Sequence, residues 1–194
     1  MKRLLVAALA LTAGGTAVSA ADLRPQDATP LPPLPRSAPS FISEVRFGVT
    51  AQDPTGPESG SANLIGEILS VRPFAAADPV LNSLIPRIHV GGSLNLAGNT
   101  SFGYAGLTWT FDITPAIFVE GSLGGAVHNG ETDPIDDHHN ALGCTALFRE
   151  SGSVGMRVTE NWTVMATVEH LSNAGLCSNN RGLTNFGLKV GYAF

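Results

Sequence analysis

Apolar and polar residues alternate with a period of two along most of the chain after residue 40. On a β-strand, successive side chains point to opposite faces, so residues two apart share a face. The segment 162–173 is a clear example, because one of its faces would consist of Trp162, Val164, Ala166, Val168, His170 and Ser172. This face is apolar until it ends in a histidine and a serine.

Turn-forming residues divide the alternating region into segments of strand length. We predict eight strands, at Phe41–Ala51, Ala62–Arg72, Arg87–Ala97, Ser101–Ile113, Ala116–Val127, Leu142–Val158, Trp162–Asn173 and Leu183–Phe194. No strong amphipathic helix is predicted. A tilted strand needs about 9–11 residues to span a membrane, and bacterial outer-membrane barrels have an even number of strands. Number and length therefore both favour a barrel.

The polar faces of these segments carry charges of both signs. The set comprises Glu44, Arg46, Glu67, His89, Glu120, Arg149, Arg157, Glu169 and Lys189. Opposite charges can pair in a narrow lumen while the apolar faces contact lipid. The sequence therefore predicts an all-β fold, an antiparallel eight-stranded transmembrane β-barrel of the outer membrane. A soluble β-sandwich, with the apolar faces turned inward, is the alternative.

The first 40 residues have a different character. Lys2 and Arg3 precede the apolar run Leu4–Leu11, and the small residues at 18–20 suit a cleavage site, so residues 1–20 are predicted to be a secretory signal peptide. Six prolines follow within residues 21–40, which predicts an extended linker. Residues 41–194 are left for the barrel.

Charge and hydropathy limit the kinds of molecule that the chain is expected to bind. The chain of 194 residues has a formal net charge of −5, and without a basic excess nucleic acid is not an expected partner. After the signal, no apolar run reaches the roughly 18 residues that a membrane-spanning helix needs. The exported chain is therefore expected either to be soluble or to cross a membrane as strands.

Loop lengths predict an orientation. The connections at 114–115 and 159–161 are short, whereas those at 52–61, 128–141 and 174–182 are longer. Outer-membrane barrels keep short turns in the periplasm and long loops outside. Both termini are then periplasmic, and His170 and Ser172 lie at the outer end of their strand, facing the external leaflet.

The His170 and Ser172 side chains can act together chemically. Residues i and i+2 on a strand lie about 6.5–7 Å apart, a distance from which two side chains can lean into a hydrogen bond. A serine beside a histidine is a nucleophile beside its base. The alternative is two polar residues at the rim of the membrane.

Three motifs extend this interpretation: His-Leu-Ser-Asn at 170–173, Asn-Arg-Gly at 180–182 and a C-terminal Gly-Tyr-Ala-Phe at 191–194. Together they resemble the lipid A 3-O-deacylase family of outer-membrane acyl hydrolases, most strongly over residues 142–194. The resemblance implies hydrolysis of the ester-linked acyl chain at the 3-position of lipid A. It also implies that Ser172 is the nucleophile and His170 the base, and that Asn173 or Asn180 contributes to an oxyanion hole. Such a mechanism requires no cofactor.

The acidic member of the site departs from the family pattern. The family has a glutamate early in the last strand that orients the histidine, and Thr184 occupies that place here. Thr184 cannot act as a carboxylate, but it falls on the same apolar face, near His170 across the hairpin. Register offers another acid. If the turn before Trp162 centres on Glu160, paired residues have numbers that sum to about 320, which puts Glu150 opposite His170. We predict that Glu150 faces outward and orients His170. The alternative is a bulge that turns Glu150 into the lumen.

The same register brings the two cysteines together. Cys144 would lie opposite residue 176, adjacent to Cys177. Cysteines placed side by side in an exported protein are expected to form a disulfide.

One predicted outer loop is rich in possible metal ligands: Glu131, Asp133, Asp136, Asp137, His138 and His139. Carboxylates and imidazoles can bind a divalent cation. Their spacing matches no known binding loop, so a solvated acidic loop is favoured and no metal site is predicted.

The sequence thus favours a lipid A 3-O-deacylase, a carboxylic ester hydrolase with lipopolysaccharide as substrate and the bacterial outer membrane as its location. Two alternatives stay open: a structural or adhesion barrel without activity, and an outer-membrane phospholipase or esterase. Either a monomer or a homodimer is compatible with the sequence.

Overall fold

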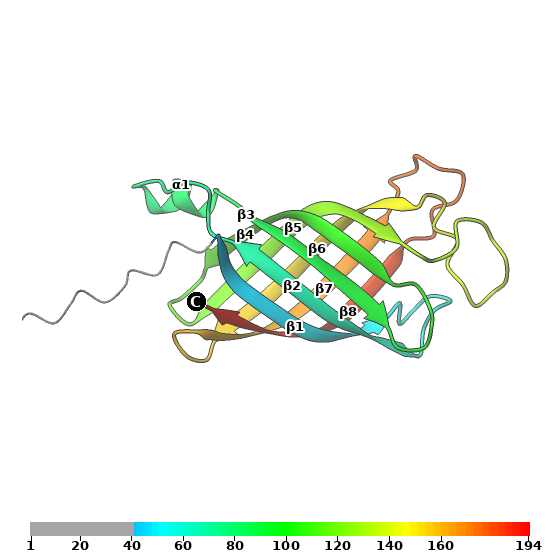
Figure 1. The fold of residues 1–194 in the computed structure, drawn as a ribbon, viewed down its shortest axis with the longest axis horizontal. Helices are drawn as coiled ribbons and strands as arrows, with labels where there is room; N and C mark the ends of the chain where they lie inside the picture. Colours follow the sequence, from blue (N-terminus) through cyan, green and yellow to red (C-terminus); the bar gives the residue numbers. More distant parts are fainter. Residues whose placement is uncertain (1–40) are drawn as a thin grey trace, which may run out of the picture. The chain divides into compact units, whose positions relative to one another are not determined.

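The computed structural model describes residues 41–194; the predicted signal peptide and linker lie outside the described residues. Eight antiparallel strands close into one barrel, each pairing with the next and β8 pairing with β1 (Figure 1). The elements are β1 Ile42–Gln52, β2 Ser61–Ser70, α1 Pro79–Ser83, β3 Arg87–Asn95, β4 Phe102–Asp112, β5 Ile117–His128, β6 Ala146–Arg157, β7 Trp162–Ser172 and β8 Leu183–Ala193. The predicted barrel is confirmed, and the soluble sandwich is excluded.

Two local details differ from the prediction. Strand β6 begins at Ala146 rather than Leu142, because Gly143 has a φ of 79° and interrupts the extended backbone. The connection 71–86 contains the short helix α1, which the sequence pattern did not reveal. Its first turn is capped by the Asp78 side chain, which accepts a hydrogen bond of 2.9 Å from the Leu81 backbone amide. A single turn is too short to show helical periodicity.

The apolar faces point outward, as predicted. Large exposed side chains on the outer surface of the strands include Phe47, Leu94, Leu123, Phe148, Phe186 and Leu188. The polar faces point into the lumen. In the part of the chain that the structure describes, no helix has the length and apolar character needed to cross a membrane.

Ion pairs fill much of the lumen. Arg46 reaches Glu44 at 2.7 Å, Glu120 at 2.7 Å and Glu67 at 3.3 Å. Arg149 pairs with Glu169 at 2.7 Å, and both side chains are buried. Arg157, which the pattern also placed on a polar face, lies at the rim and pairs with the exposed Asp112.

An apolar cluster occupies one part of the lumen, which the alternation did not predict. It consists of Phe102, Tyr104, Ala126, Leu142, Leu147, Leu171 and Leu183, with Cys144 packed against it. Leu171 and Leu183 pair across β7 and β8, and both are fully buried. The backbone between His170 and Ser172, and the part of β8 that pairs with it, are therefore held in place by apolar packing inside the barrel.

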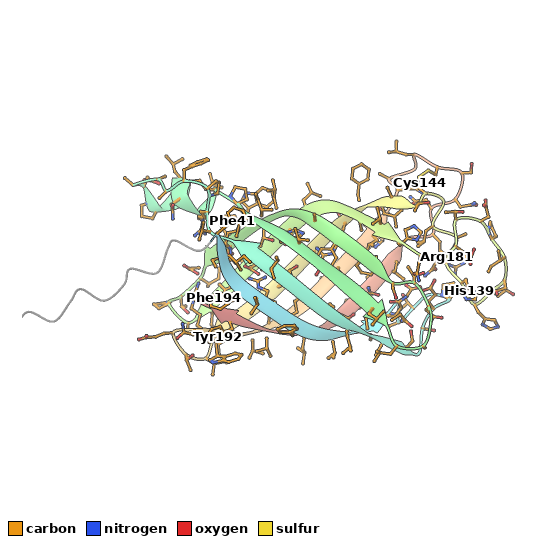
Figure 2. All side chains as sticks on the ribbon, in the orientation of Figure 1. Phe41, His139, Cys144, Arg181, Tyr192 and Phe194 are labelled. Atoms are coloured by element: carbon orange, nitrogen blue, oxygen red, sulfur yellow. A yellow bond between two sulfur atoms is a disulfide. The ribbon has the colours of Figure 1, made fainter. Side chains whose placement is uncertain are left out.

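The two ends of the barrel differ. The connections 53–60, 96–101, 129–145 and 173–182 lie at what we call the loop end, and the connections 71–86, 113–116 and 158–161 lie at the termini end. Figure 2 shows Phe41 and Phe194 at the termini end, and His139, Arg181 and Cys144 at the loop end. The connections predicted to be long lie at the loop end, and those predicted to be short lie at the termini end. Two connections depart from the general rule: 71–86 is long at the termini end, and 96–101 is short at the loop end. Strand β7 runs toward the loop end, so His170 and Ser172 lie at its loop-end terminus.

Candidate functional site

The His170 and Ser172 side chains lie on the outer surface of β7. Both are half-buried, and Leu171 between them points into the lumen. Exposed apolar side chains surround the pair on the same surface, among them Val168 on β7, Phe148 on β6 and Phe186 on β8. A polar pair bordered by apolar surface on a transmembrane barrel is in a position to contact membrane lipid.

Thr184 holds the imidazole of His170 from β8. The two residues are paired across the β7–β8 ladder, and the Thr184 hydroxyl oxygen lies 2.8 Å from Nδ1 of His170. This is the hydrogen bond that fixes the direction of the ring. The sequence predicted Thr184 at the position of the family glutamate and near His170 across the hairpin, and the pairing confirms that placement. The hydrogen bond itself is seen only in the structure.

Gly182 lies beside the Cε1–Nε2 edge of the ring. A Cβ atom at this position would approach Cε1 of His170 to 2.9 Å and Nε2 to 3.3 Å. The absence of a side chain at residue 182 therefore leaves the room in which the imidazole sits. Sequence reasoning treated this glycine only as part of a motif.

Ser172 shares the surface of His170, as the alternation predicted. No hydrogen bond joins the two side chains among the contacts of residues 41–194. Their i, i+2 spacing leaves such a bond within reach of side-chain rotation, and catalytic hydrogen bonds often tighten only when substrate is bound. The Ser172–His170 hydrogen bond stays a prediction.

Glu150 lies where the register predicted. It pairs with His170 across β6 and β7, the ladder continues without a bulge, and its side chain is exposed on the outer surface. Directly opposite residues have Cβ atoms about 4.5–5.5 Å apart. No hydrogen bond or ion pair between Glu150 and His170 occurs within the described residues. The position of Glu150 is thus confirmed, whereas its role in orienting His170 stays a prediction.

The two asparagines predicted to serve an oxyanion hole are used differently. Asn173 is buried and donates from Nδ2 to the carbonyls of Leu142 and Asn179, while its Oδ1 accepts from the Gly175 amide. Both of its side-chain hydrogens are thereby engaged in holding the loop. Asn180 is exposed and uses Oδ1 to accept from the Asn173 amide at 2.9 Å, which leaves its Nδ2 group as the more available donor.

Cys144 and Cys177 form the predicted disulfide, with Cα atoms 5.9 Å apart. The bond joins the loop 129–145 to the loop 173–182. Together with the Asn173 hydrogen bond to Leu142 (2.8 Å), it ties the segment after Ser172 to the neighbouring connection.

The acidic loop makes a local ion pair. Nδ1 of His139 lies 2.9 Å from the Asp136 carboxylate. This hydrogen bond raises the pKa of His139 above its usual value and lowers the pKa of Asp136. Within residues 41–194, no three His, Cys, Asp or Glu side chains are grouped so that they could hold a metal ion.

Comparison with known proteins identifies a family and supports the barrel fold. The sequence model of the family described as PagL, lipid A 3-O-deacylase, matches residues 85–193. The crystal structure of the outer membrane enzyme PagL superposes with a TM-score of 0.62 at 18% identity, covering 78% of this chain and 100% of that one. No curated protein matches the chain.

Two further barrels show the same fold. A de novo designed transmembrane β-barrel gives a TM-score of 0.51 at 14% identity, covering 81% of this chain and 98% of that chain. The N-terminal barrel domain of Pseudomonas aeruginosa OprF gives 0.50 at 13% identity, with coverages of 80% and 98%. At such identities the likeness concerns the fold alone.

The protein is therefore an outer-membrane β-barrel that carries a histidine and a serine side by side on its lipid-facing surface. Because the family model covers more than half of the sequence, the chain belongs to the lipid A 3-O-deacylase (PagL) family.

Proposed function

We propose that this barrel hydrolyses the ester-linked acyl chain at the 3-position of lipid A, with Ser172 as nucleophile and His170 as general base. The observation that carries the proposal is the placement of both side chains on the outer surface of β7, at the loop end and among apolar side chains. A substrate in the outer leaflet reaches such a site without leaving the membrane. Membership of the family supports the choice of lipid A among outer-leaflet lipids.

The reaction proceeds in two halves. Oγ of Ser172 attacks the acyl carbonyl while Nε2 of His170 takes the hydroxyl proton. The tetrahedral intermediate collapses, the sugar C–O oxygen leaves with the proton from His170, and the acyl group stays on Ser172. Water, deprotonated by His170, then attacks the acyl–serine ester; the fatty acid leaves and His170 returns the proton to Oγ of Ser172. Each half returns the histidine to its neutral form, so no cofactor enters.

The surrounding side chains divide the remaining tasks. The Nδ2 group of Asn180 donates to the developing oxyanion. Glu150, opposite His170, favours the imidazolium that forms during each half-reaction, because an opposite charge within about 4–6 Å stabilises the charged form. The loop end faces the cell exterior, in keeping with the rule that long loops are external.

Mass spectrometry of lipid A from cells that express the barrel tests the proposal. Wild type is expected to remove one 3-linked acyl chain, and Ser172→Ala to remove none. Ser59→Ala, an exposed serine in another loop-end connection, is the matched control and should act as wild type does. Glu150→Gln should lower turnover by about tenfold, because the imidazolium that forms in each half-reaction loses the carboxylate opposite it.

Two results would count against the proposal. Full activity of Ser172→Ala would exclude the nucleophile. Unchanged lipid A in cells that contain folded wild-type protein would exclude lipid A as the substrate. If the purified barrel then released fatty acid from phospholipid vesicles, the site would be that of a phospholipase.

A further inference from the structure

The ring of His170 is held by a neutral side chain. Thr184 places its hydroxyl 2.8 Å from Nδ1, whereas the one carboxylate directly paired with His170, that of Glu150, makes no hydrogen bond to it within the described part of the chain. The group that orients the His170 ring, Thr184, therefore comes from β8, whereas the negative charge opposite the ring, that of Glu150, comes from β6.

The direction of Thr184 is fixed by its two chain neighbours. Leu183 is fully buried in the apolar cluster of the lumen. Asn185 is also fully buried, and it donates to Glu169 at 3.1 Å and accepts from the Asp53 amide at 3.1 Å. Because side chains alternate along β8, two inward neighbours hold Thr184 outward. A threonine is also restricted about χ1, so its hydroxyl has few directions available.

The contact has a consequence for the proton on the ring. A neutral histidine that accepts a proton at Nε2 must carry its own proton on Nδ1. When the Thr184 oxygen accepts from Nδ1–H, the lone pair of Nε2 is left at the edge of the ring beside Gly182, a residue without a side chain. A hydroxyl can accept as well as donate, so this contact is compatible with the form of His170 that can take a proton from Ser172.

We propose that Thr184 is a positioning residue for His170, which holds the imidazole and its Nδ1–H form through the hydroxyl and leaves the charge to Glu150. This inference rests on the proposed hydrolase function. In the family this position holds a glutamate; here, by this proposal, Thr184 orients the base His170 without adding a charge.

Four variants test the assignment in purified, detergent-solubilised barrel with lipid A as substrate. Thr184→Val keeps the branched shape and removes only the hydroxyl, whereas Thr184→Ser keeps the hydroxyl. Thr163→Val removes a hydroxyl from the termini end of β7 that has no hydrogen-bond partner among residues 41–194, and it serves as control. The fourth variant is Glu150→Gln.

Loss of one hydrogen bond to the base should lower kcat of Thr184→Val by about tenfold, with KM within about twofold. Thr184→Ser should recover most of the rate, and Thr163→Val should match wild type.

Nitrogen-15 NMR of the histidines, with His170→Gln to assign the signal, should show the Nδ1–H form in wild type and a mixture in Thr184→Val. Glu150→Gln removes the carboxylate opposite the ring and should lower kcat while leaving the Nδ1–H signal in place.

An unchanged kcat and an unchanged NMR signal in Thr184→Val would overturn the inference, as would a Thr184→Ser variant no better than Thr184→Val. If wild type releases no acyl chain, the proposed function fails on that result alone. The NMR comparison then decides by itself whether Thr184 holds the ring, because it needs no turnover.

Discussion

At the scale of single residues, Gly182 controls the space available to the catalytic candidate. Its φ is 73°, a conformation that side chains with a Cβ rarely adopt, and a Cβ there would approach the ring of His170 to 2.9 Å and the Leu171 carbonyl to 3.2 Å. Gly175 in the same loop also has a positive φ, of 80°, but nothing lies within 4 Å of its added Cβ. Substitutions at the two glycines therefore distinguish the effect of backbone strain, expected at both, from the effect of contact with the imidazole, expected only at Gly182.

We expect Gly182→Ala to reduce lipid A deacylation at least tenfold, and to cost about 1–2 kcal/mol of stability from strain in the left-handed conformation. Gly175→Ala should incur a similar strain and keep most of its activity. Release of the acyl chain is measured alongside the unfolding midpoint for both. Equal losses of activity in the two variants would contradict a specific role for the space beside His170.

Register explains which residues of the site were predictable. The period of two placed His170 and Ser172 on one surface, and the short turn at Glu160 placed Glu150 opposite His170, since both depend only on backbone pairing. The partner of Nδ1 depends on a side-chain rotation, which pairing does not determine. The hydrogen bond to Thr184 and the engagement of Asn173 in its loop could therefore be observed only in the structure.

At the scale of elements, the strands were predictable and the loop end was not. Alternation marks each strand because lipid and lumen select opposite side chains. Loops have no such periodicity, so the late start of β6 and the apolar cluster that includes Leu142 were missed. The disulfide was an exception, because Cys144 and Cys177 lie just beyond paired strand ends and inherit their register.

The disulfide should support the site more than the barrel. Its bond closes a segment with a sequence separation of 33, worth about 3–4 kcal/mol in a chain-entropy model. We expect Cys144→Ser/Cys177→Ser to lose much of its activity and to be cut by protease at 129–145 or 173–182, while the strands stay protected. Wild type in reductant should behave in the same way. Full activity of the reduced protein would show that the bond does not hold the loop that follows Ser172.

At the scale of the whole molecule, the barrel separates stability from chemistry. The buried ion pairs lie inside and the candidate site lies outside, on opposite faces of the strands. Arg46 joins carboxylates from three strands, Glu44 on β1, Glu67 on β2 and Glu120 on β5. The mixed charges predicted such pairing, but not which residues would meet, because strands that are distant in the ladder face each other only after the barrel closes.

Removing Arg46 should destabilise the barrel without altering the reaction. Arg46→Ala would leave buried carboxylates short of a counter-charge, and breaking a buried pair from one side costs about 3–5 kcal/mol. Arg157→Ala breaks a pair whose Asp112 side chain is 63% exposed, and exposed pairs contribute about 0–1 kcal/mol. Urea unfolding in detergent should therefore show a large fall in midpoint for the first variant and little change for the second.

Turnover per folded molecule should match wild type in both, because neither arginine reaches the outer surface near His170. A fall in turnover of folded Arg46→Ala would mean that the lumen and the site are coupled through the strands.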